Sequence, residues 1–299
     1  MRRYFTNSMI AAAALVWGCT VSHAQDAERI VSLGGSVTEI LYELGADDRI
    51  AALDVTSVYP PQALRDKPNV GYIRALNAEG VLAADPDLII AEHDAGPPEV
   101  VDILETASVP FVRIDAAYSA DGILKKIRTV GAAIGQGEAA EVLAGRVASE
   151  FAKTEQAVAA ASGGKKPKVL FILSLQDGRL MVAGENNQAA SVIEMAGGEN
   201  LMHSFEGYKS VDDEALLASP PDVIVMMMRA NHGADNSVLS AHPALKDSPA
   251  IRDQRIVRMG GMYLLGFGPR TAYAVADLAR ALYPDAAELK ALPKLDAKP

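Results

Sequence analysis

The chain has 299 residues, with 28 lysines and arginines against 38 aspartates and glutamates, so its formal net charge is −10. Such an acidic chain is not expected to bind nucleic acid, and it offers no basic amphipathic face for anionic lipid. Its length is enough for two domains of ordinary size.

An export signal is predicted over residues 1–24. Two arginines precede an apolar stretch that is too short to span a bilayer, and Ser22-His23-Ala24 places small residues at positions −3 and −1 of a cleavage site. Cleavage after Ala24 would remove Cys19, the only cysteine, and leave a chain without disulfides. Processing as a lipoprotein, with Cys19 lipidated, is the alternative. Either route takes the protein out of the cytoplasm.

Residues 25–119 are predicted to form a first lobe in which short apolar runs alternate with helices. Ser36 is expected to begin the first helix as its N-cap, Glu39 to complete a capping box, and Gly45 to end the helix. Alternation of this kind indicates a mostly parallel sheet covered on both faces. The expected strands are 29–33, 87–91 and 109–114, and the expected helices are 37–45 and 97–107.

Residues 120–165 are predicted to form a long helical connection, interrupted at Gly135-Gln136-Gly137 and ended by Gly163-Gly164. The alternation then restarts, so that residues 166–299 form a second lobe. The expected fold class is α/β: two Rossmann-like lobes with central, mostly parallel sheets, joined by one long helix, with a ligand cleft between them. Strands are expected at 169–173, 223–227 and 256–259, and helices at 188–196 and 271–282.

An internal repeat supports two lobes of one plan. Residues 79–90, E-G-V-L-A-A-D-P-D-L-I-I, match residues 214–225, E-A-L-L-A-S-P-P-D-V-I-V. In both copies a helix that carries an exposed glutamate, Glu79 or Glu214, leads through Pro-Asp into a central strand. A glutamate on a helix surface is usually only a solvated charge, but two at equivalent positions of two lobes are harder to dismiss.

Tyr59 stands directly before two prolines, in a stretch that follows an apolar run. Proline fixes its own φ and pushes the preceding residue out of the α region, so Tyr59 is expected on a stiff, extended loop. Such a loop can aim a phenol at a ligand. From the local sequence alone, a solvent-facing tyrosine packed on proline is the simpler interpretation.

Four blocks of the sequence, in this order, resemble the periplasmic substrate-binding proteins that have a rigid interlobe helix and serve ABC importers of cobalamin, iron siderophores and haem. The resemblance covers essentially the whole chain after the export signal, and the haem-binding branch is the nearest match. The blocks are T-S-V-Y-P at 56–60, V-G-Y-I-R-A-L at 70–76, E-H-D-A-G-P-P at 92–98 and L-L-G-F-G-P-R at 264–270.

The resemblance implies that Tyr59 is the axial ligand of ferric haem, the metal ligand of the site, with Arg229 as the cation beside its phenolate. Phenolate is a hard oxygen donor suited to Fe(III). Some relatives have a basic residue two positions after this tyrosine and a histidine ligand in the second lobe. Pro61 and the 175–178 region occupy those places here, so a single five-coordinate haem is expected.

The remaining site residues also follow from the resemblance. Tyr72 and Arg74 are expected near the mouth of the cleft, with Arg74 as a candidate for a haem propionate. Glu79 and Glu214 fit the positions where relatives dock on arginines of the permease. His93 is expected to be structural. The second lobe is expected to line the cleft with Met228, Met262 and Tyr263.

We therefore predict a monomeric periplasmic protein that takes haem b arriving through an outer-membrane haem receptor and delivers it to the permease and ATPase of an ABC importer. A ferric siderophore or cobalamin as ligand is the alternative within the same fold. The chain shows neither a G-x-S-x-G elbow, an H-E-x-x-H helix nor a nucleotide loop, so an enzyme is not expected. A carrier of divalent metal ions remains a third possibility.

Overall fold

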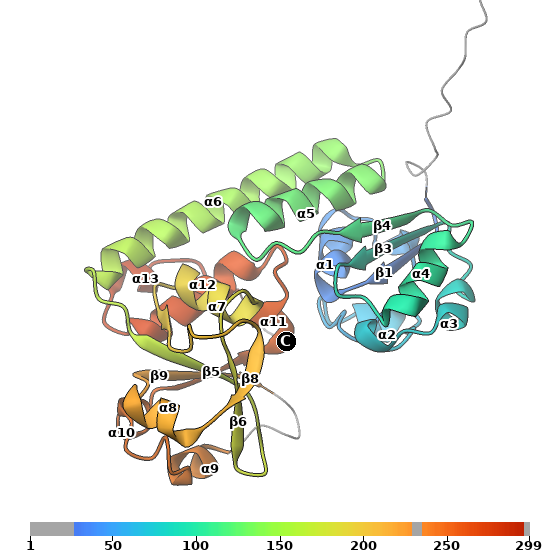
Figure 1. The fold of residues 1–299 in the computed structure, drawn as a ribbon. Helices are drawn as coiled ribbons and strands as arrows, with labels where there is room; N and C mark the ends of the chain where they lie inside the picture. The colour runs from blue at the N-terminus through green and yellow to red at the C-terminus, as the bar shows by residue number, and fades with distance from the viewer. Residues whose placement is uncertain (1–26, 229–234, 296–299) are drawn as a thin grey trace, which may run out of the picture.

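The computed structural model describes residues 27–228 and 235–295, which form two α/β lobes bridged by a long helix (Figure 1). The predicted export signal, Cys19 and Arg229 lie outside the described residues. Within the described ranges, no helix combines the length and the apolar character needed to cross a membrane.

The first lobe contains a four-stranded parallel sheet in the order β2-β1-β3-β4. Its central strands β1 and β3 are buried over their whole length, because helices cover both faces of the sheet. The predicted alternation of strands and helices is confirmed. The elements are β1 (Ile30–Leu33), α1 (Gly35–Glu43), η1 (Asp47–Arg49), β2 (Ile50–Leu53), α2 (Ala63–Asp66), η2 (Ile73–Ala75), α3 (Ala78–Leu82), β3 (Leu88–Glu92), α4 (Pro98–Thr106) and β4 (Phe111–Ile114).

The connection between the lobes consists of α5 (Ala120–Ala133) and α6 (Gly137–Ser162). Gly135 and Gly163, both with positive φ, follow the two helices, as the glycine pattern predicts. Helix α6 has 26 residues and is therefore about 39 Å long. It packs on α5 at one end and on α12 and α13 of the second lobe at the other, and so spans both lobes (Figure 1).

The second lobe contains a six-stranded mixed sheet in the order β10-β9-β5-β6-β8, with β7 also paired to β5. Strands β9 and β10 are parallel to β5, whereas β6 and β8 form an antiparallel extension. The elements are β5 (Lys168–Gln176), β6 (Arg179–Ala183), α7 (Gln188–Met195), β7 (Glu199–Asn200), β8 (Tyr208–Val211), α8 (Asp213–Ala218), β9 (Val223–Met228), α9 (Asn236–Ala241), α10 (Pro249–Arg252), β10 (Ile256–Gly260), α11 (Gly261–Leu265), α12 (Thr271–Leu282) and α13 (Ala287–Lys290).

One buried apolar cluster continues from the first lobe through α6 into the second. It includes Ile40 of α1, Ile127 of α5, Val147 and Phe151 of α6, and Val275 of α12. A helix whose apolar residues belong to both lobes cannot act as a loose linker. The lobes are therefore held at a defined separation along α6.

The internal repeat predicted from the sequence is visible in the backbone. The amide of Asp87 donates to the carbonyl of Arg29 at 3.0 Å, and the amide of Asp222 donates to the carbonyl of Lys168 at 2.9 Å. Each aspartate carboxylate accepts the amide of the same partner, at 3.0 and 2.8 Å. The Pro-Asp pair thus joins the central strand of each lobe to that lobe's first strand.

Candidate ligand-binding cleft

A cavity of about 610 Å³ lies between the lobes and is lined by both of them. This volume is within the range of sites for small molecules and cofactors. The wall from the first lobe and α5 is mostly polar, with Ser36, Thr56, Tyr72, Arg74, Glu92, His93, Asp94, Asp115, Tyr118 and Lys126. The wall from the second lobe is mostly apolar, with Leu173, Met227, Met262, Leu265 and Phe267 beside Gln188 and Tyr208.

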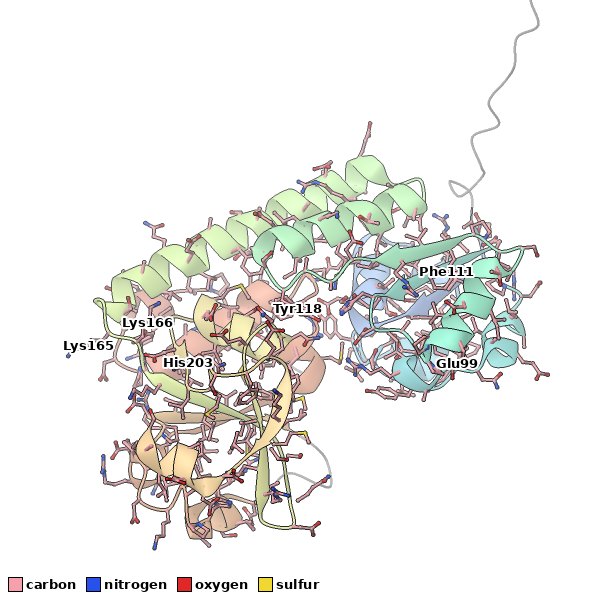
Figure 2. All side chains as sticks on the ribbon, in the orientation of Figure 1. Glu99, Phe111, Tyr118, Lys165, Lys166 and His203 are labelled. Atoms are coloured by element: carbon pink, nitrogen blue, oxygen red, sulfur yellow. The ribbon has the colours of Figure 1, made fainter. Side chains whose placement is uncertain are left out.

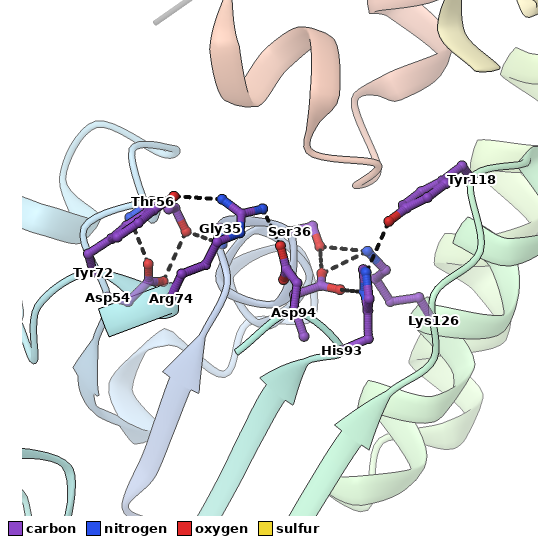
Figure 3. Close-up of polar contacts among 11 residues, drawn as sticks. Gly35, Ser36, Asp54, Thr56, Tyr72, Arg74, His93, Asp94, Tyr118 and Lys126 are labelled. Carbon is purple, nitrogen blue, oxygen red and sulfur yellow. Dashed lines mark hydrogen bonds and ion pairs between the residues drawn. The ribbon is translucent and has the colours of Figure 1, made fainter. Parts of the chain in front are cut away.

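Tyr72 and Arg74 form a hydrogen-bonded pair on the polar wall (Figure 3). Arg74 Nη1 donates to the hydroxyl of Tyr72 at 2.6 Å, and Arg74 Nη2 is ion-paired with Asp94. Ile73 between them is buried and anchors the segment, and Gly71, with φ 101°, makes a turn that favours glycine. Burial lowers the pKa of Arg74, but the hydrogen bond to Tyr72 and the charge of Asp94 outweigh it and raise the pKa overall.

A buried charge pair lies farther along the same wall. Lys126 Nζ is 2.7 Å from Glu92 Oε1 and donates to Ser36 Oγ at 2.8 Å, while the Ser36 hydroxyl donates to Glu92. The exposed fractions of the two charged side chains are only 6% and 12%. The charges compensate each other, which a buried pair of this kind requires.

The predicted capping box at Ser36 is wrong. The N-cap of α1 is Gly34, which has no side chain, and the free amides are satisfied from the next strand–loop segment instead. Asp54 Oδ1 accepts the amide of Gly34 at 2.8 Å, and Thr56 Oγ1 accepts the amide of Gly35 at 2.9 Å. Part of the T-S-V-Y-P block therefore caps α1, and Ser36 is free to bind Lys126.

Tyr59, the predicted haem ligand, is not among the lining residues that the described structure gives for this cavity. Its ring instead packs against Arg270 of the second lobe, with 3.5 Å between Arg270 Cζ and the ring centroid. The cation expected near a phenolate, Arg229, lies outside the described residues. Tyr72 and Arg74, by contrast, are a hydrogen-bonded phenol and cation that both line the cavity.

His93 and Tyr118 form a second polar pair on the first-lobe wall, with 3.0 Å between His93 Nε2 and the Tyr118 hydroxyl. Tyr118 lies in the region where the two lobes meet (Figure 2). Burial raises the pKa of Tyr118, and burial raises the pKa of Tyr208, on the opposite wall, to about 12. Burial therefore makes both phenols harder to ionise than a solvent-exposed tyrosine.

The described residues contain no group of three or more histidine, cysteine, aspartate or glutamate side chains placed to hold a metal ion. His242 of the second lobe is buried with its Nε2 3.0 Å from the carbonyl oxygen of Gly178.

The predicted second-lobe lining is found only in part. Met262 lines the cavity, together with Met227 of the same methionine-rich region. Met228 is 53% exposed at the end of β9, and Tyr263 is buried with its hydroxyl donating to Asp277 at 3.0 Å. Neither of these two is among the lining residues of the described structure.

Glu79 and Glu214 occupy equivalent positions, as the repeat predicts. Each is exposed in the first turn of its helix, Glu79 in α3 and Glu214 in α8. Acidic side chains are favourable there because the helix dipole is positive at its start. Their exposure leaves both carboxylates accessible to a partner.

Sequence reasoning missed Lys126 and Tyr118 as lining residues. Lys126 had a signal, because it lies between Ile123 and Ile127 on the buried side of α5. A lysine on the apolar side of a helix requires a charged partner, which is Glu92. Tyr118 gave no such signal, because it stands in the irregular segment before α5.

Comparison with known proteins places these features in a family. The periplasmic binding protein family model matches residues 30–263. The structure resembles the periplasmic heme-binding protein RhuT from Roseiflexus sp. RS-1 in its apo form, with a TM-score of 0.80 and 35% identity over 87% of this chain and 99% of that one. It also resembles a periplasmic heme-binding protein from Pseudomonas aeruginosa, with a TM-score of 0.79 and 35% identity over 87% and 94% of the two chains.

One protein with a similar sequence is named for a different ligand. A cobalamin-binding protein from Halobacterium salinarum is 26% identical over 262 residues, which are 86% of this chain and 69% of the relative. The family match spans both lobes and the helical connection. The chain therefore belongs to the periplasmic binding protein family, whose members are exported substrate-binding proteins of ABC importers rather than enzymes.

Proposed function

We propose that the cleft binds ferric haem and that the protein carries this haem to the permease of an ABC importer. The observation that supports this most directly is the pair formed by Tyr72 and Arg74, a phenol on the cavity wall with a guanidinium 2.6 Å from its oxygen. Tyrosine is an established haem ligand, and a phenolate suits Fe(III). A cation beside a phenol favours the anionic form that iron binds.

The proposal places the iron ligand at Tyr72 rather than at Tyr59. Tyr72 lines the cavity and is 43% exposed, so it is available to a ligand in the cleft. Tyr59 packs its ring on Arg270 instead. Its proline-bound loop serves the contact between the lobes.

The opposite wall suits the flat face of a porphyrin. Met227, Met262 and Leu265 present apolar side chains there, and methionine adapts its shape to a planar ligand. In the part of the chain that the structure describes, no histidine lines this wall. We therefore propose one haem with Tyr72 as its only axial ligand from the protein.

Cobalamin is the second candidate ligand, because a relative named as a cobalamin-binding protein shares 26% identity with this chain. A ferric siderophore is a third within the same fold. The wall that carries Tyr72 and Arg74 favours haem, since neither alternative requires a phenol held by a guanidinium.

The test is a titration of the mature protein with ferric haem, followed by absorbance, beside a titration with cyanocobalamin followed by calorimetry. Haem is expected to saturate one site and to give a high-spin ferric spectrum with a charge-transfer band. Cyanocobalamin is expected to give no saturable heat. Saturation by cyanocobalamin with only non-saturating uptake of haem would replace haem by cobalamin as the proposed ligand.

We propose that the two exposed glutamates dock the protein on the permease when it delivers haem. Glu79 and Glu214, one on each lobe, would contact basic residues of the permease and orient the cleft toward the translocation path. We propose that the protein acts as a monomer, and that its haem arrives through an outer-membrane receptor. The protein itself catalyses no reaction in this scheme.

A further inference from the structure

The two lobes touch directly beside the cavity, through the loop that joins α11 to α12. Arg270 at the end of this loop forms an ion pair with Glu39 of α1, with 3.0 Å between Nε and Oε2. The backbone amide of Arg270 also donates to Glu39 Oε1 at 2.9 Å. One carboxylate of the first lobe is thus held twice by a single residue of the second lobe.

This contact is buried. The exposed fractions of the Arg270 and Glu39 side chains are 5% and 6%. The guanidinium lies over one ring of each lobe, with Arg270 Cζ 3.5 Å from the ring centroid of Tyr59 and 5.5 Å from that of Tyr263. Arg270 Nη1 is buried without a hydrogen-bond partner among the described residues, so the aromatic rings are its favourable neighbours.

The backbone of the loop also fits closely against α1. A Cβ atom added at Gly268 would lie 3.2 Å from Ser36 Cβ and 3.3 Å from Glu39 Cδ, which is tighter than most contacts of a Cβ atom and shows how closely the loop approaches α1. Phe267 is 2% exposed and packs edge-on against Tyr118, with 5.5 Å between ring centroids. The loop and the first lobe are therefore fitted to each other over several residues.

The contact between Glu39 and Arg270 can set the width of the cavity, because each of the two residues lies close in sequence to a residue of the cavity wall. Ser36, three residues before Glu39 in α1, lines the cavity, and so does Phe267, three residues before Arg270. Any change in the separation of Glu39 and Arg270 would move these two walls relative to each other. The separation of the walls is the quantity that decides whether a flat ligand fits between them.

We propose that Glu39, Arg270 and Tyr59 form an interlobe clamp that sets the width of the cleft. They act as positioning residues, because none of them lines the cavity in the described structure. The ion pair resists opening because separating the lobes breaks both contacts that Arg270 makes to the Glu39 carboxylate. Tyr59, on its proline-bound loop, supports the guanidinium from the first lobe. This assigns a role to the conspicuous tyrosine of the sequence.

The first test measures the distance between the lobes in the ligand-free protein. Spin labels are placed at Asp102→Cys on α4 and Lys246→Cys in the second lobe, both exposed, with Cys19 replaced by serine. Double electron–electron resonance is then recorded for the parent protein, Glu39→Gln and Arg270→Lys. We expect both clamp variants to broaden the distance distribution.

Glu43→Gln is the matched control. It makes the same change one turn along α1, where the carboxylate pairs with Arg146 at 2.6 Å on a more exposed surface. Its distance distribution should coincide with that of the parent. Distributions of Glu39→Gln and Arg270→Lys that also coincide with the parent would overturn the clamp. If either variant fails to fold, Tyr59→Leu, which leaves the ion pair intact, takes its place with the same expectation.

The second test rests on the proposed function and measures the rate at which haem leaves the protein. Clamp variants are expected to release haem about tenfold faster or more, which corresponds to about 1.4 kcal/mol. The spectrum of bound haem should not change, because Tyr72 and Arg74 are untouched. Unchanged release from all clamp variants would contradict the clamp. Failure of the parent protein to bind haem would instead overturn the proposed function, and the distance measurement would still decide on the clamp.

Discussion

Arg74 and Tyr72 share a hydrogen bond of 2.6 Å on the cavity wall, and Asp94 holds the other side of the same guanidinium (Figure 3). Tyr72 and Asp94 thereby fix the orientation of the guanidinium beside the phenol oxygen. A site organised in advance loses less conformational freedom when its ligand binds.

Tyr72→Phe should remove most of the affinity for ferric haem and abolish the charge-transfer band, because phenylalanine keeps the ring but has no oxygen for iron. The loss is expected to be about 100-fold or more, since a metal–ligand bond is lost. The measurement is an absorbance titration with ferric haem.

Tyr59→Phe is the matched control for this change. It keeps the ring that packs on Arg270, so the spectrum and affinity should be close to those of the parent protein. A charge-transfer band lost in Tyr59→Phe and retained in Tyr72→Phe would return the ligand to Tyr59.

Arg74→Gln should weaken the binding of ferric haem, because the guanidinium that donates to the phenol oxygen of Tyr72 is lost. A loss of affinity of about tenfold or more is expected in an absorbance titration with ferric haem. Arg65→Gln, which removes an exposed arginine paired with Asp66, should leave the titration unchanged. Identical titrations for both variants would remove Arg74 from the site.

The sequence predicted the parts of the fold that depend on local pattern. Apolar runs identified the central strands, and the Pro-Asp repeat identified the two lobes. The hairpin of β5 and β6 was missed although its signal was present, since Asp177 and Gly178 form an Asp-Gly turn with φ of 51° and 75°. The sequence contains no comparable turn signal for strand β8, which pairs with β6.

Distant residues decide several local roles at the site, which is why the sequence alone does not predict them. Ser36 is not a cap because Asp54 and Thr56, from another segment, bond to the start of α1. Tyr59 and Tyr72 both stand in distinctive blocks, and the local sequence cannot tell which of them lines a cavity. Arg270, in the other lobe, occupies the face of Tyr59. Such contacts exist only once both lobes have folded.

Lys126→Met should destabilise the protein by about 3–5 kcal/mol, because it leaves the Glu92 carboxylate buried without its cation. The double variant Lys126→Met with Glu92→Met should recover a large part of this loss, since it removes both charges. Urea unfolding at neutral pH measures both effects. The control is Lys125→Met, which breaks an exposed pair with Asp115 and should cost less than about 1 kcal/mol. Equal losses of unfolding free energy in Lys126→Met and Lys125→Met would show that the buried ion pair stabilises the protein no more than the exposed one.

Stability should fall between about pH 10 and pH 12 in part because of Tyr208. Burial raises its pKa from 10.0 to about 12 in the folded protein. Below pH 10 the phenol is neutral in both states, whereas between these values it ionises only in the unfolded chain, which favours unfolding. The contribution of Tyr208 to the loss is at most about 3 kcal/mol. Urea unfolding at pH 8 and pH 11 should show a smaller decrease for Tyr208→Phe, and an equal decrease would contradict the assignment.

Glu79→Ala combined with Glu214→Ala should leave haem binding unchanged and reduce uptake through the cognate permease. Both carboxylates are exposed, and neither lines the cavity in the described structure, so their loss affects only contacts made outside the protein. Charges at the rim of an interface mainly steer and orient partners, so uptake should fall most at low salt.

Glu99→Ala with Glu288→Ala is the matched control, because these exposed glutamates also begin helices, α4 and α13. Uptake into vesicles that contain the importer is compared for the two double variants. Equal uptake would show that the glutamates of the repeat do not dock on the permease, whereas a loss confined to Glu79 and Glu214 would place the two lobes on it together.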